Sequence, residues 1–368
     1  MSHLPLRAAI AGCEPYGAPE LVVPARLNVN ENPYSPSEAV ARDIAEAVYA
    51  AALGANRYPE RDFPRLRAAL ADYLAVESGV RLAPAQVWAA NGSNEVMLHI
   101  LQAFGGPGRV LVSADPTYSM YPEYARDTNT GYRTVARRPD FTVDVDALLD
   151  VARAEEAAVV VLASPNNPTG TALPASDVSR IASGLRGAGP HGADCVLVID
   201  EAYAEFRRDG VASALELLDE HRNLAVSRTM SKAFAMAGLR LGYLAAAHDI
   251  VDALRIVRLP YHLSAITQAA ALAALGHRDA LMSQIAELRE ARDELADWLE
   301  EVGFDVVTSD ANFILFGHLP NRHEIWAQLV DRGVLIREVG PPGYLRVSVG
   351  TARENRMFRH ALLEVTDG

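Results

Sequence analysis

The chain has 368 residues, with 34 Lys and Arg against 47 Asp and Glu, and a formal net charge of −13. This acidic balance argues against nucleic acid or an anionic membrane surface as a partner. The length is sufficient to bury a large core and exceeds that of a typical single domain. Only Cys13 and Cys195 are present, so we expect no disulfide framework and a reducing, cytoplasmic setting.

Several other classes of segment and site are not expected. Apolar runs such as residues 269–275 are far too short to span a bilayer, and the first residues lack a signal-peptide pattern. The ten histidines include no close pair of zinc-site type, so we expect no metal. No Gly-x-Ser-x-Gly elbow is present, and no dinucleotide-binding glycine loop follows a predicted strand.

The first candidate site lies where a predicted strand, residues 86–90, meets a predicted helix. Residues 91–95 open this helix, and apolar residues follow at helical spacing. Ser93 is expected to cap the helix, and Gly92 lets the backbone approach a ligand closely, which together make an anion site. Taken alone, the pattern is also that of an ordinary capped helix. Further along, Tyr118 is either a ring-stacking aromatic or a core residue.

Two continuous apolar runs, residues 159–163 and 195–199, predict strands covered on both faces of a parallel sheet. The first runs into a turn with Pro and Gly that aims Asn167, and the second is followed by Asp200. Open α/β sheets bind ligands at the carboxyl ends of their strands. Asp200 there can keep a pyridine nitrogen protonated and make the ring an electron sink, whereas an Asp more often begins a surface loop.

Lys232 is the only lysine, and the other 33 of the 34 basic residues are arginines. Arginine can replace lysine in ion pairs, but it cannot lose its proton near neutral pH and attack a carbonyl carbon. Arginine-biased coding alone would also leave a single lysine. However, Lys232 follows a predicted strand and lies near Thr229, Ser231 and Arg240, which suits a cofactor with both a phosphate and an aldehyde. Pyridoxal phosphate is that cofactor, and a lysine Schiff base is its usual tether.

Strands alternate with helices through the first two-thirds of the chain, which predicts a mostly parallel sheet flanked by helices. We place this large α/β domain at residues 36–250. A helical stretch from about 250 to 301, interrupted near Pro260 and Gly276, leads into a smaller α+β part. Residues 251–368 are therefore expected to form a linking helix and a small C-terminal domain.

In their order along the chain, the motifs resemble the fold-type I, aspartate-aminotransferase-like family, and within it the histidinol-phosphate aminotransferases. The likeness extends from about Tyr16 to Asn355. It implies the fold-type I architecture, with residues 1–35 forming an arm that packs with the small domain. Ser35, where many relatives have Gly, and the short segment 340–343 depart from the family. The matching blocks are residues 30–34, 56–59, 91–95, 164–170, 200–203, 228–240, 311–313, 333–337 and 345–351.

The resemblance implies a role for each matching residue. Lys232 would form the Schiff base, Asp200 would pair with the pyridinium nitrogen, and Tyr118 would stack on the ring. Tyr203, the third expected catalytic residue, and Asn167 would hydrogen-bond the ring hydroxyl. The cofactor phosphate would lie among Gly92, Ser93, Asn94, Thr229, Ser231 and Arg240, with Tyr58 reaching it across a homodimer interface, and the anionic end of the substrate would meet Tyr16, Asn32, Arg337 and Arg346.

The activity implied is transfer of an amino group between L-histidinol phosphate and 2-oxoglutarate, a step of histidine biosynthesis. An aromatic-amino-acid aminotransferase or a phospho-amino-acid decarboxylase of similar fold stays open, because the same anion-binding arginine serves each. A non-catalytic regulator built on such a domain is disfavoured. The matching blocks begin near Tyr16 and leave no room for an added DNA-binding domain.

Overall fold

The computed structural model describes residues 4–366, except for the side chain of Leu281. Within that range the main sheet has seven strands in the order β2-β8-β7-β6-β5-β3-β4. Neighbouring strands are parallel except at β8, which is antiparallel to both β2 and β7. The expected mostly parallel α/β sheet is thus confirmed. Its strands are β2 (Val87–Ala90), β3 (Val110–Asp115), β4 (Gly131–Ala136), β5 (Val159–Ala163), β6 (Val196–Asp200), β7 (Leu224–Thr229) and β8 (Gly242–Ala246).

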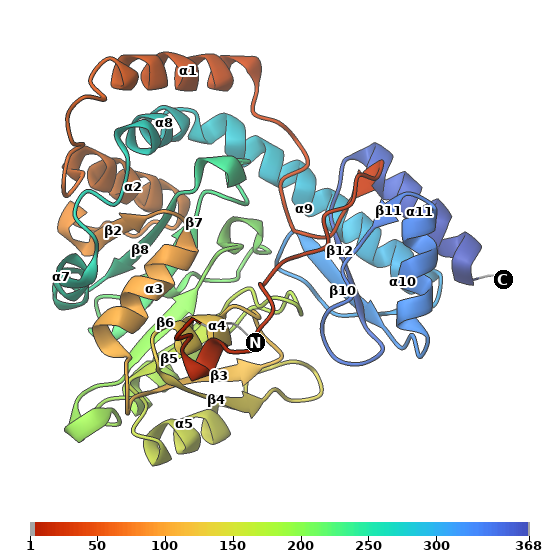
Figure 1. The fold of residues 1–368 in the computed structure, drawn as a ribbon. Coiled ribbons are helices and arrows are strands. Elements are labelled where there is room, and N and C mark those ends of the chain that lie inside the picture. The colour runs from red at the N-terminus through yellow and green to blue at the C-terminus, as the bar shows by residue number, and fades with distance from the viewer. Residues whose placement is uncertain (1–3, 367–368) are drawn as a thin grey trace.

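Helices surround this sheet, as Figure 1 shows. β5 and β6 are buried at every position, which their unbroken apolar runs predict for strands covered on both faces. Each parallel connection requires a crossover, and helices supply most of them. The helices of this part are α1 (Glu38–Ala52), α2 (Pro64–Glu77), α3 (Ser93–Phe104), α4 (Tyr121–Asp127), α5 (Val145–Ala154), α6 (Ala175–Gly184) and α7 (His248–Val257).

A second, smaller group of elements lies beside the first, and α9 (Arg278–Glu301) runs from one to the other (Figure 1). Leu288 of α9 packs in the large core and Leu295 in a separate small core. The expected interruptions of the helical stretch are confirmed, because α8 ends before α9 begins. The remaining elements are α8 (Ala265–Leu275), α10 (Arg322–Asp331) and α11 (Ala352–Thr366), with an antiparallel sheet of β9 (Asp305–Val306), β10 (Phe313–Gly317) and β12 (Leu345–Ser348).

The N-terminal segment contacts both groups of elements. Arg7 donates to the Asp127 carbonyl oxygen at the end of α4. Further along, β1 (Ala25–Arg26) pairs in parallel with β11 (Val334–Leu335), beside the smaller sheet. Residues 8–24 therefore pass from one group to the other. The division into segments 1–35, 36–250 and 251–368 stays a prediction, and residues 1–3 and 367–368 lie outside the described range.

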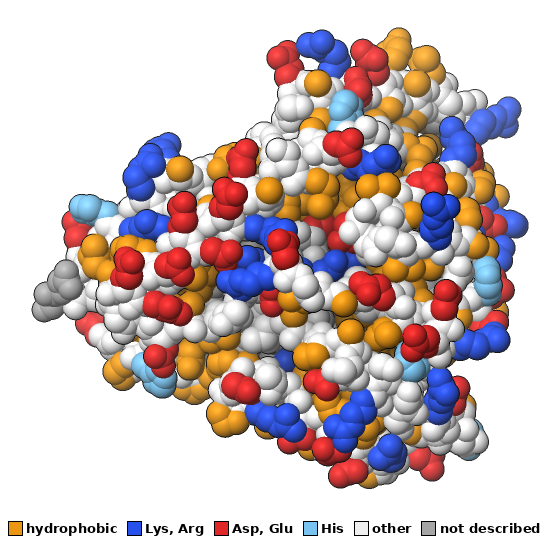
Figure 2. All heavy atoms as spheres, turned by 180° about the vertical axis from the view of Figure 1, so that it is seen from behind, with side chains coloured by type: hydrophobic (Ala, Val, Ile, Leu, Met, Phe, Trp, Pro, Cys, Tyr) orange, Lys and Arg blue, Asp and Glu red, His pale blue; other side chains and the backbone are white. Residues whose placement is uncertain are grey.

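Charges of both signs cover the surface. Figure 2 shows acidic and basic side chains interspersed over one face, with basic side chains gathered near its middle. No helix within residues 4–366 is long and apolar enough to cross a membrane. In the same part of the chain, no group of three or more His, Cys, Asp or Glu side chains is placed to hold a metal ion.

Candidate active site

A cavity of about 260 Å³ opens at the carboxyl ends of three neighbouring strands. Ala163, Asp200 and Thr229, the last residues of β5, β6 and β7, all line it. This is the place where open α/β sheets bind ligands. Among its lining residues are most of those predicted from the sequence: Tyr16, Ser93, Asn94, Tyr118, Asn167, Asp200, Tyr203, Thr229, Ser231, Lys232, Arg240, Arg337 and Arg346.

One end of the cavity is formed by the first turn of α3. Gly92 is the N-cap residue, with φ 84°, and Ser93 is the first helical residue. The expectation that Ser93 caps the helix is wrong, because Gly92, which has no side chain, takes the N-cap position. The positive φ at Gly92 favours glycine, and a Cβ there would lie 2.8 Å from Arg240 Nη2. The free N–H groups of this turn make an anion site at the helix N-terminus.

Hydroxyl and guanidinium groups from the segment after β7 complete this end. Thr229 Oγ1 donates to Ser231 Oγ at 3.1 Å, and Arg240 Nη1 donates to Ser231 Oγ at 3.4 Å. The segment after β7 thus brings the Arg240 guanidinium back to Ser231, the residue before Lys232. Gly242 lets β8 approach α3, since a Cβ there would lie 2.1 Å from the Ser93 nitrogen. Hydroxyls, backbone N–H groups and a guanidinium converge as a phosphate requires.

The amine of Lys232 is enclosed at the wall of the cavity. Its Nζ donates to the Val29 carbonyl oxygen at 2.8 Å. Burial lowers the pKa of Lys232 to about 8, and the nearby charges of Arg346 and Arg240 act in the same direction. A sizeable fraction of the amine is then neutral near physiological pH. This is the condition for a nucleophilic lysine.

Asp200 has one oxygen bonded and one free. Tyr121 donates its hydroxyl proton to Oδ2 at 3.1 Å, while Oδ1 is buried without a hydrogen-bond partner among residues 4–366. Burial raises the pKa of Asp200 to about 6, although the Tyr121 hydrogen bond acts in the opposite direction. The carboxylate is ionised at neutral pH and can accept one further N–H. A protonated pyridine nitrogen fits that vacancy.

Tyr203 receives two donors on its hydroxyl oxygen. Asn30 Nδ2 donates to it at 3.0 Å and Asn167 Nδ2 at 3.5 Å. Burial raises the pKa of Tyr203, so the phenol keeps its proton. With its oxygen already accepting, the hydroxyl proton is directed to a third group, as a ring oxygen of the cofactor would require.

The opposite end of the cavity is cationic. Arg346 is buried and donates to the Asn28 carbonyl oxygen at 2.7 Å and to Asn167 Oδ1. Within the described residues its Nε lacks a partner, as does Nη1 of Arg337. The backbones of the two arginines pair with each other at 2.9 Å in both directions. Tyr16 lies at the same end and accepts a hydrogen bond from Ser119 at 3.2 Å. The arrangement suits an anionic ligand.

Three predicted residues do not line the cavity in the single chain: Gly92, which directly precedes the lining residue Ser93, and Asn32 and Tyr58. Asn32 donates to the Ala233 carbonyl oxygen at 3.3 Å and is not among the lining residues. Tyr58 is 80% exposed and stacks on Tyr261 with ring centroids 4.5 Å apart, also outside the cavity. The segment around Tyr58 has neither helix nor strand.

Three supporting residues were not predicted. Tyr121 and Asn30 orient Asp200 and Tyr203, and Tyr124 donates to Asn94 Oδ1 at 2.9 Å. Asn30 falls within a block that matched the resembled family, which was the only available signal for it. Tyr121 and Tyr124 follow Tyr118 closely in sequence, but nothing local shows what their hydroxyls would reach.

Known proteins are similar to this chain in both sequence and fold. The family model for aminotransferase class I and II matches residues 24–362. The histidinol-phosphate aminotransferase of Bifidobacterium longum (strain NCC 2705) is 55% identical over 375 residues, covering 99% of this chain and 97% of that protein. That of Thermobifida fusca (strain YX) is 56% identical over 366 residues, covering 100% and 96% respectively.

A solved structure gives the same picture in three dimensions. The histidinol-phosphate aminotransferase from Sinorhizobium meliloti, in complex with pyridoxal-5'-phosphate, has a TM-score of 0.84 and 26% identity, covering 99% of this chain and 98% of that one. Fold and site together define an enzyme that transfers amino groups. The chain belongs to the class I and II aminotransferase family.

Proposed function

We propose that this enzyme is a histidinol-phosphate aminotransferase that moves an amino group between L-histidinol phosphate and 2-oxoglutarate with pyridoxal phosphate as cofactor. The observation that carries the proposal is the position of Lys232. Its amine shares one cavity with the free oxygen of Asp200, an anion site at the start of α3, and two arginines at the other end. Relatives more than half identical carry that name.

Each cofactor contact has a residue suited to it. Pyridoxal phosphate, when bound, supplies an aldehyde for a Schiff base with Lys232 and a ring that withdraws electrons from the substrate carbon. Asp200 Oδ1 would hold the ring nitrogen, Tyr203 and Asn167 would hold the ring oxygen, and Tyr118 would cover one ring face. The phosphate is held by the Gly92 to Asn94 backbone, Thr229, Ser231 and Arg240.

Lys232 then acts a second time, as the base. With the cofactor bound, Lys232 Nζ would be placed to take a proton from the substrate carbon and to release it again. The lowered pKa of Lys232, about 8, suits an amine that must both take up and release a proton near neutral pH. Asp200, ionised beside the ring nitrogen, stabilises the positive charge that makes the ring accept electrons.

The anionic end of each substrate is assigned to Arg346, with Arg337 and Tyr16 nearby. The same guanidinium has to bind the phosphate of histidinol phosphate in one half-reaction and a carboxylate of 2-oxoglutarate in the other. A planar, bidentate donor can bind both groups. The free Nε of Arg346 and the free Nη1 of Arg337, judged within residues 4–366, supply the donors. Asn32, which donates to Ala233, does not line the cavity in the single chain, and its contact with substrate stays a prediction.

Steady-state kinetics with two amino donors test the substrate. Histidinol phosphate and phenylalanine are each paired with 2-oxoglutarate, and kcat/KM is compared. We expect histidinol phosphate to be strongly preferred. A preference for phenylalanine would reject the proposal in favour of an aromatic-amino-acid aminotransferase, and release of carbon dioxide from a phospho-amino acid would favour a decarboxylase.

A homodimer with shared sites accounts for Tyr58. Its exposed ring stacks on Tyr261, and we propose that it contacts the cofactor phosphate of the second subunit. Mixing Tyr58→Phe with Lys232→Ala subunits places both lesions in one site of a heterodimer and leaves the other intact. Partial recovery of activity is expected. Absence of recovery after demonstrated subunit exchange, with each parent impaired, would refute sharing.

A further inference from the structure

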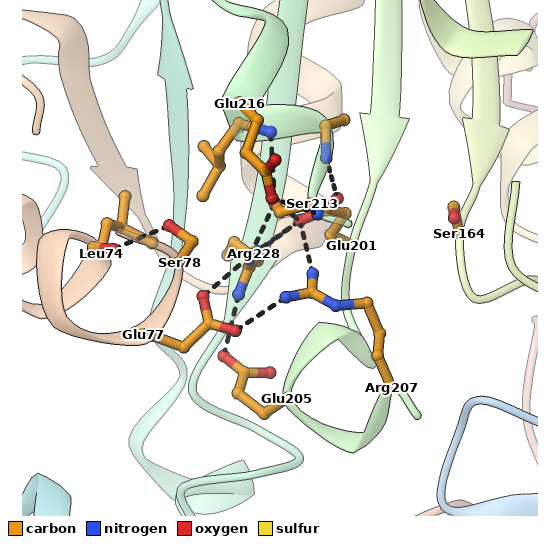
Figure 3. Close-up of polar contacts among 12 residues, drawn as sticks. Leu74, Glu77, Ser78, Ser164, Glu201, Glu205, Arg207, Ser213, Glu216 and Arg228 are labelled. Atoms are coloured by element: carbon orange, nitrogen blue, oxygen red, sulfur yellow. Dashed lines mark hydrogen bonds and ion pairs between the residues drawn. The ribbon is translucent and has the colours of Figure 1, made fainter. Parts of the chain in front are cut away.

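A buried cluster of charged side chains lies behind the ends of β6 and β7 (Figure 3). The Arg228 side chain is 0% exposed, and those of Glu77, Glu201 and Glu205 are no more than 5% exposed. Charges are rarely removed from water so completely without a partner for each. We call the cluster the arginine network; its members are Glu77, Glu201, Glu205, Arg207, Ser213 and Arg228.

Arg228 is the centre of this network. Its Nε donates to Glu201 Oε2 at 2.8 Å, its Nη1 to Glu205 Oε1 at 3.3 Å, and its Nη2 to Glu77 Oε2 at 3.1 Å. Nη2 also donates to Ser213 Oγ at 3.1 Å. All three guanidinium nitrogens are therefore engaged. A rigid fork with this many fixed partners holds their relative positions.

Glu201 is held equally firmly on its other side. Its Oε1 accepts the Ala214 N–H at 2.7 Å, and its Oε2 accepts from Ser213 Oγ at 2.7 Å. Arg207 donates to the same Oε2 at 3.5 Å and to Glu77 at 3.0 Å. The Glu201 carboxylate thus has no freedom to move unless Arg228 or Ser213 moves with it.

The network is joined to the cavity through the chain itself. Glu201 directly follows Asp200, and Arg228 directly precedes Thr229. Asp200 and Thr229 line the cavity, whereas Glu201 and Arg228 do not. Successive side chains of an extended chain point to opposite faces, so the ion pair lies on the side away from the ligand. The Glu201 N–H also donates to the Ser227 carbonyl oxygen at 2.8 Å, which places the two strand ends side by side.

The arginine network can act on Asp200 by position and by charge. It contains two arginines and three glutamates, and Tyr73 donates its hydroxyl to Glu205 Oε1 at 3.1 Å. Burial raises the pKa of Glu205. Burial also raises the pKa of Asp200, and the charge of Glu201 acts in the same direction. A substitution that keeps the charge of Arg228 and removes its fork therefore tests position separately from charge.

We propose that Arg228 is a positioning residue of the aminotransferase reaction: through Glu201 it fixes Asp200 relative to Thr229 and Lys232. The inference rests on the proposed function, in which Asp200 meets the ring nitrogen and Thr229 the phosphate. The cofactor is rigid, so Asp200 and Thr229 must contact its ring nitrogen and its phosphate at the same time. A shift of either strand end therefore displaces the Asp200 carboxylate from the nitrogen while the phosphate stays bound.

The test uses holoenzyme with Arg228→Lys, which keeps the charge and removes the fork. Arg292→Lys is the matched control, because Arg292 is also buried, donates to the Phe206 carbonyl oxygen at 2.7 Å, and does not line the cavity. For each, the pH midpoint of the bound cofactor's visible absorbance is measured with kcat, KM and Tm. That midpoint depends on how closely Asp200 approaches the ring, so a change in fold stability alone leaves it unmoved.

We expect Arg228→Lys to shift the midpoint by roughly half a pH unit or more and to lower kcat about tenfold with little change in KM. Arg292→Lys should lower Tm and leave the midpoint in place. If Arg228→Lys does not fold, Ser213→Ala decides, because it removes one bond from each of Arg228 and Glu201. A shift of the absorbance midpoint in Ser213→Ala, smaller than that expected for Arg228→Lys, supports the positioning role.

An unmoved midpoint in the folded variant, with kinetics like those of Arg292→Lys, overturns the positioning role. The wild-type holoenzyme separates this failure from that of the proposed function. If wild type shows no cofactor absorbance or no transamination, the proposed function fails and the inference fails with it. If wild type is normal and the variant unshifted, only the positioning role is rejected.

Discussion

The cofactor end of the cavity takes its residues from adjoining strands of one sheet and from the helix that follows a third, whereas the substrate end joins segments far apart in the chain. Asp200 and Thr229 end neighbouring strands, but Arg346 bonds to Asn28, which lies 318 positions away. The first arrangement is fixed by sheet pairing and burial. The second depends on where the N-terminal segment and the smaller group of elements dock. Changes at the cofactor end should therefore lower kcat, and changes at the substrate end should chiefly raise KM.

The largest effect is expected at Lys232. Lys232→Ala removes both the nucleophile and the base, and kcat should fall by more than about 10⁴-fold. Lys232→Arg keeps the charge and is expected to be as inactive. Borohydride reduction of wild-type holoenzyme followed by peptide mass mapping should find pyridoxyl on the Lys232 peptide. Turnover that survives in Lys232→Ala would contradict the assignment.

Asp200→Asn comes next, because it removes the negative charge that, in the proposed function, keeps the ring nitrogen protonated. We expect kcat to fall by about 10²–10³-fold, with a smaller change in KM. Tyr121→Phe is the milder variant at the same place, because it leaves the Asp200 carboxyl group intact. It removes the hydrogen bond that lowers the pKa of Asp200, so this pKa rises and the acid limb of the kcat–pH profile moves to higher pH. A profile unchanged in Tyr121→Phe would show that Asp200 does not set that limb.

Arg346→Ala tests the substrate end. Loss of a charge-assisted contact should raise KM for both histidinol phosphate and 2-oxoglutarate, by roughly 10- to 100-fold, because both present an anion there. The effect on kcat should be smaller, although Asn167 loses its partner. Arg337→Ala is the control for the second guanidinium. If Arg346→Ala impairs only one half-reaction, the shared anion contact is wrong.

The pH dependence of cofactor attachment tests the environment of Lys232 in the cavity. Burial lowers the pKa of Lys232 to about 8. The fraction of Lys232 present as the reactive neutral amine therefore increases as the pH rises toward that value. The rate of covalent attachment to apoenzyme should rise about tenfold per pH unit below 8 and level off above it. Arg346 and Arg240 lower this pKa and Glu31 raises it. Glu31→Gln should therefore lower the pH at which the attachment rate levels off, and Arg346→Ala should raise that pH.

The same contrast explains what the sequence alone could predict. The strand that ends at Asp200 follows from an apolar run, and Lys232 stands out as the single lysine, because these signals are local. The expectation at Ser93 was wrong for a local reason as well. Gly92, with its positive φ, takes the N-cap position, and Ser93 becomes the first helical residue.

Contacts between distant segments left no local signal. Tyr121 reaches Asp200 across 79 positions, and Asn30 reaches Tyr203 across 173. A Tyr at the start of a helix or an Asn in a loop predicts a hydrogen bond but not its partner, which only the folded arrangement determines. Nor does any periodicity reveal Arg228, because an arginine inside a strand reads as an exposed position until Glu77 and Glu201 are seen around it.

The smallest effect is expected where an exposed contact orients the substrate end. Ser119 donates to the Tyr16 hydroxyl at 3.2 Å, and this is the bond that ties the ring to the loop after β3. Because Tyr16 is 49% exposed, Ser119→Ala should raise KM for histidinol phosphate only about two- to threefold, with kcat unchanged. Tyr16→Phe removes the same bond from the other side, along with any direct contact of the hydroxyl with substrate. If the bond is what matters, the double variant has the KM of Tyr16→Phe alone. Additive effects in the double variant would mean that Ser119 contacts the substrate itself and that Tyr16 is placed by the backbone of the N-terminal segment.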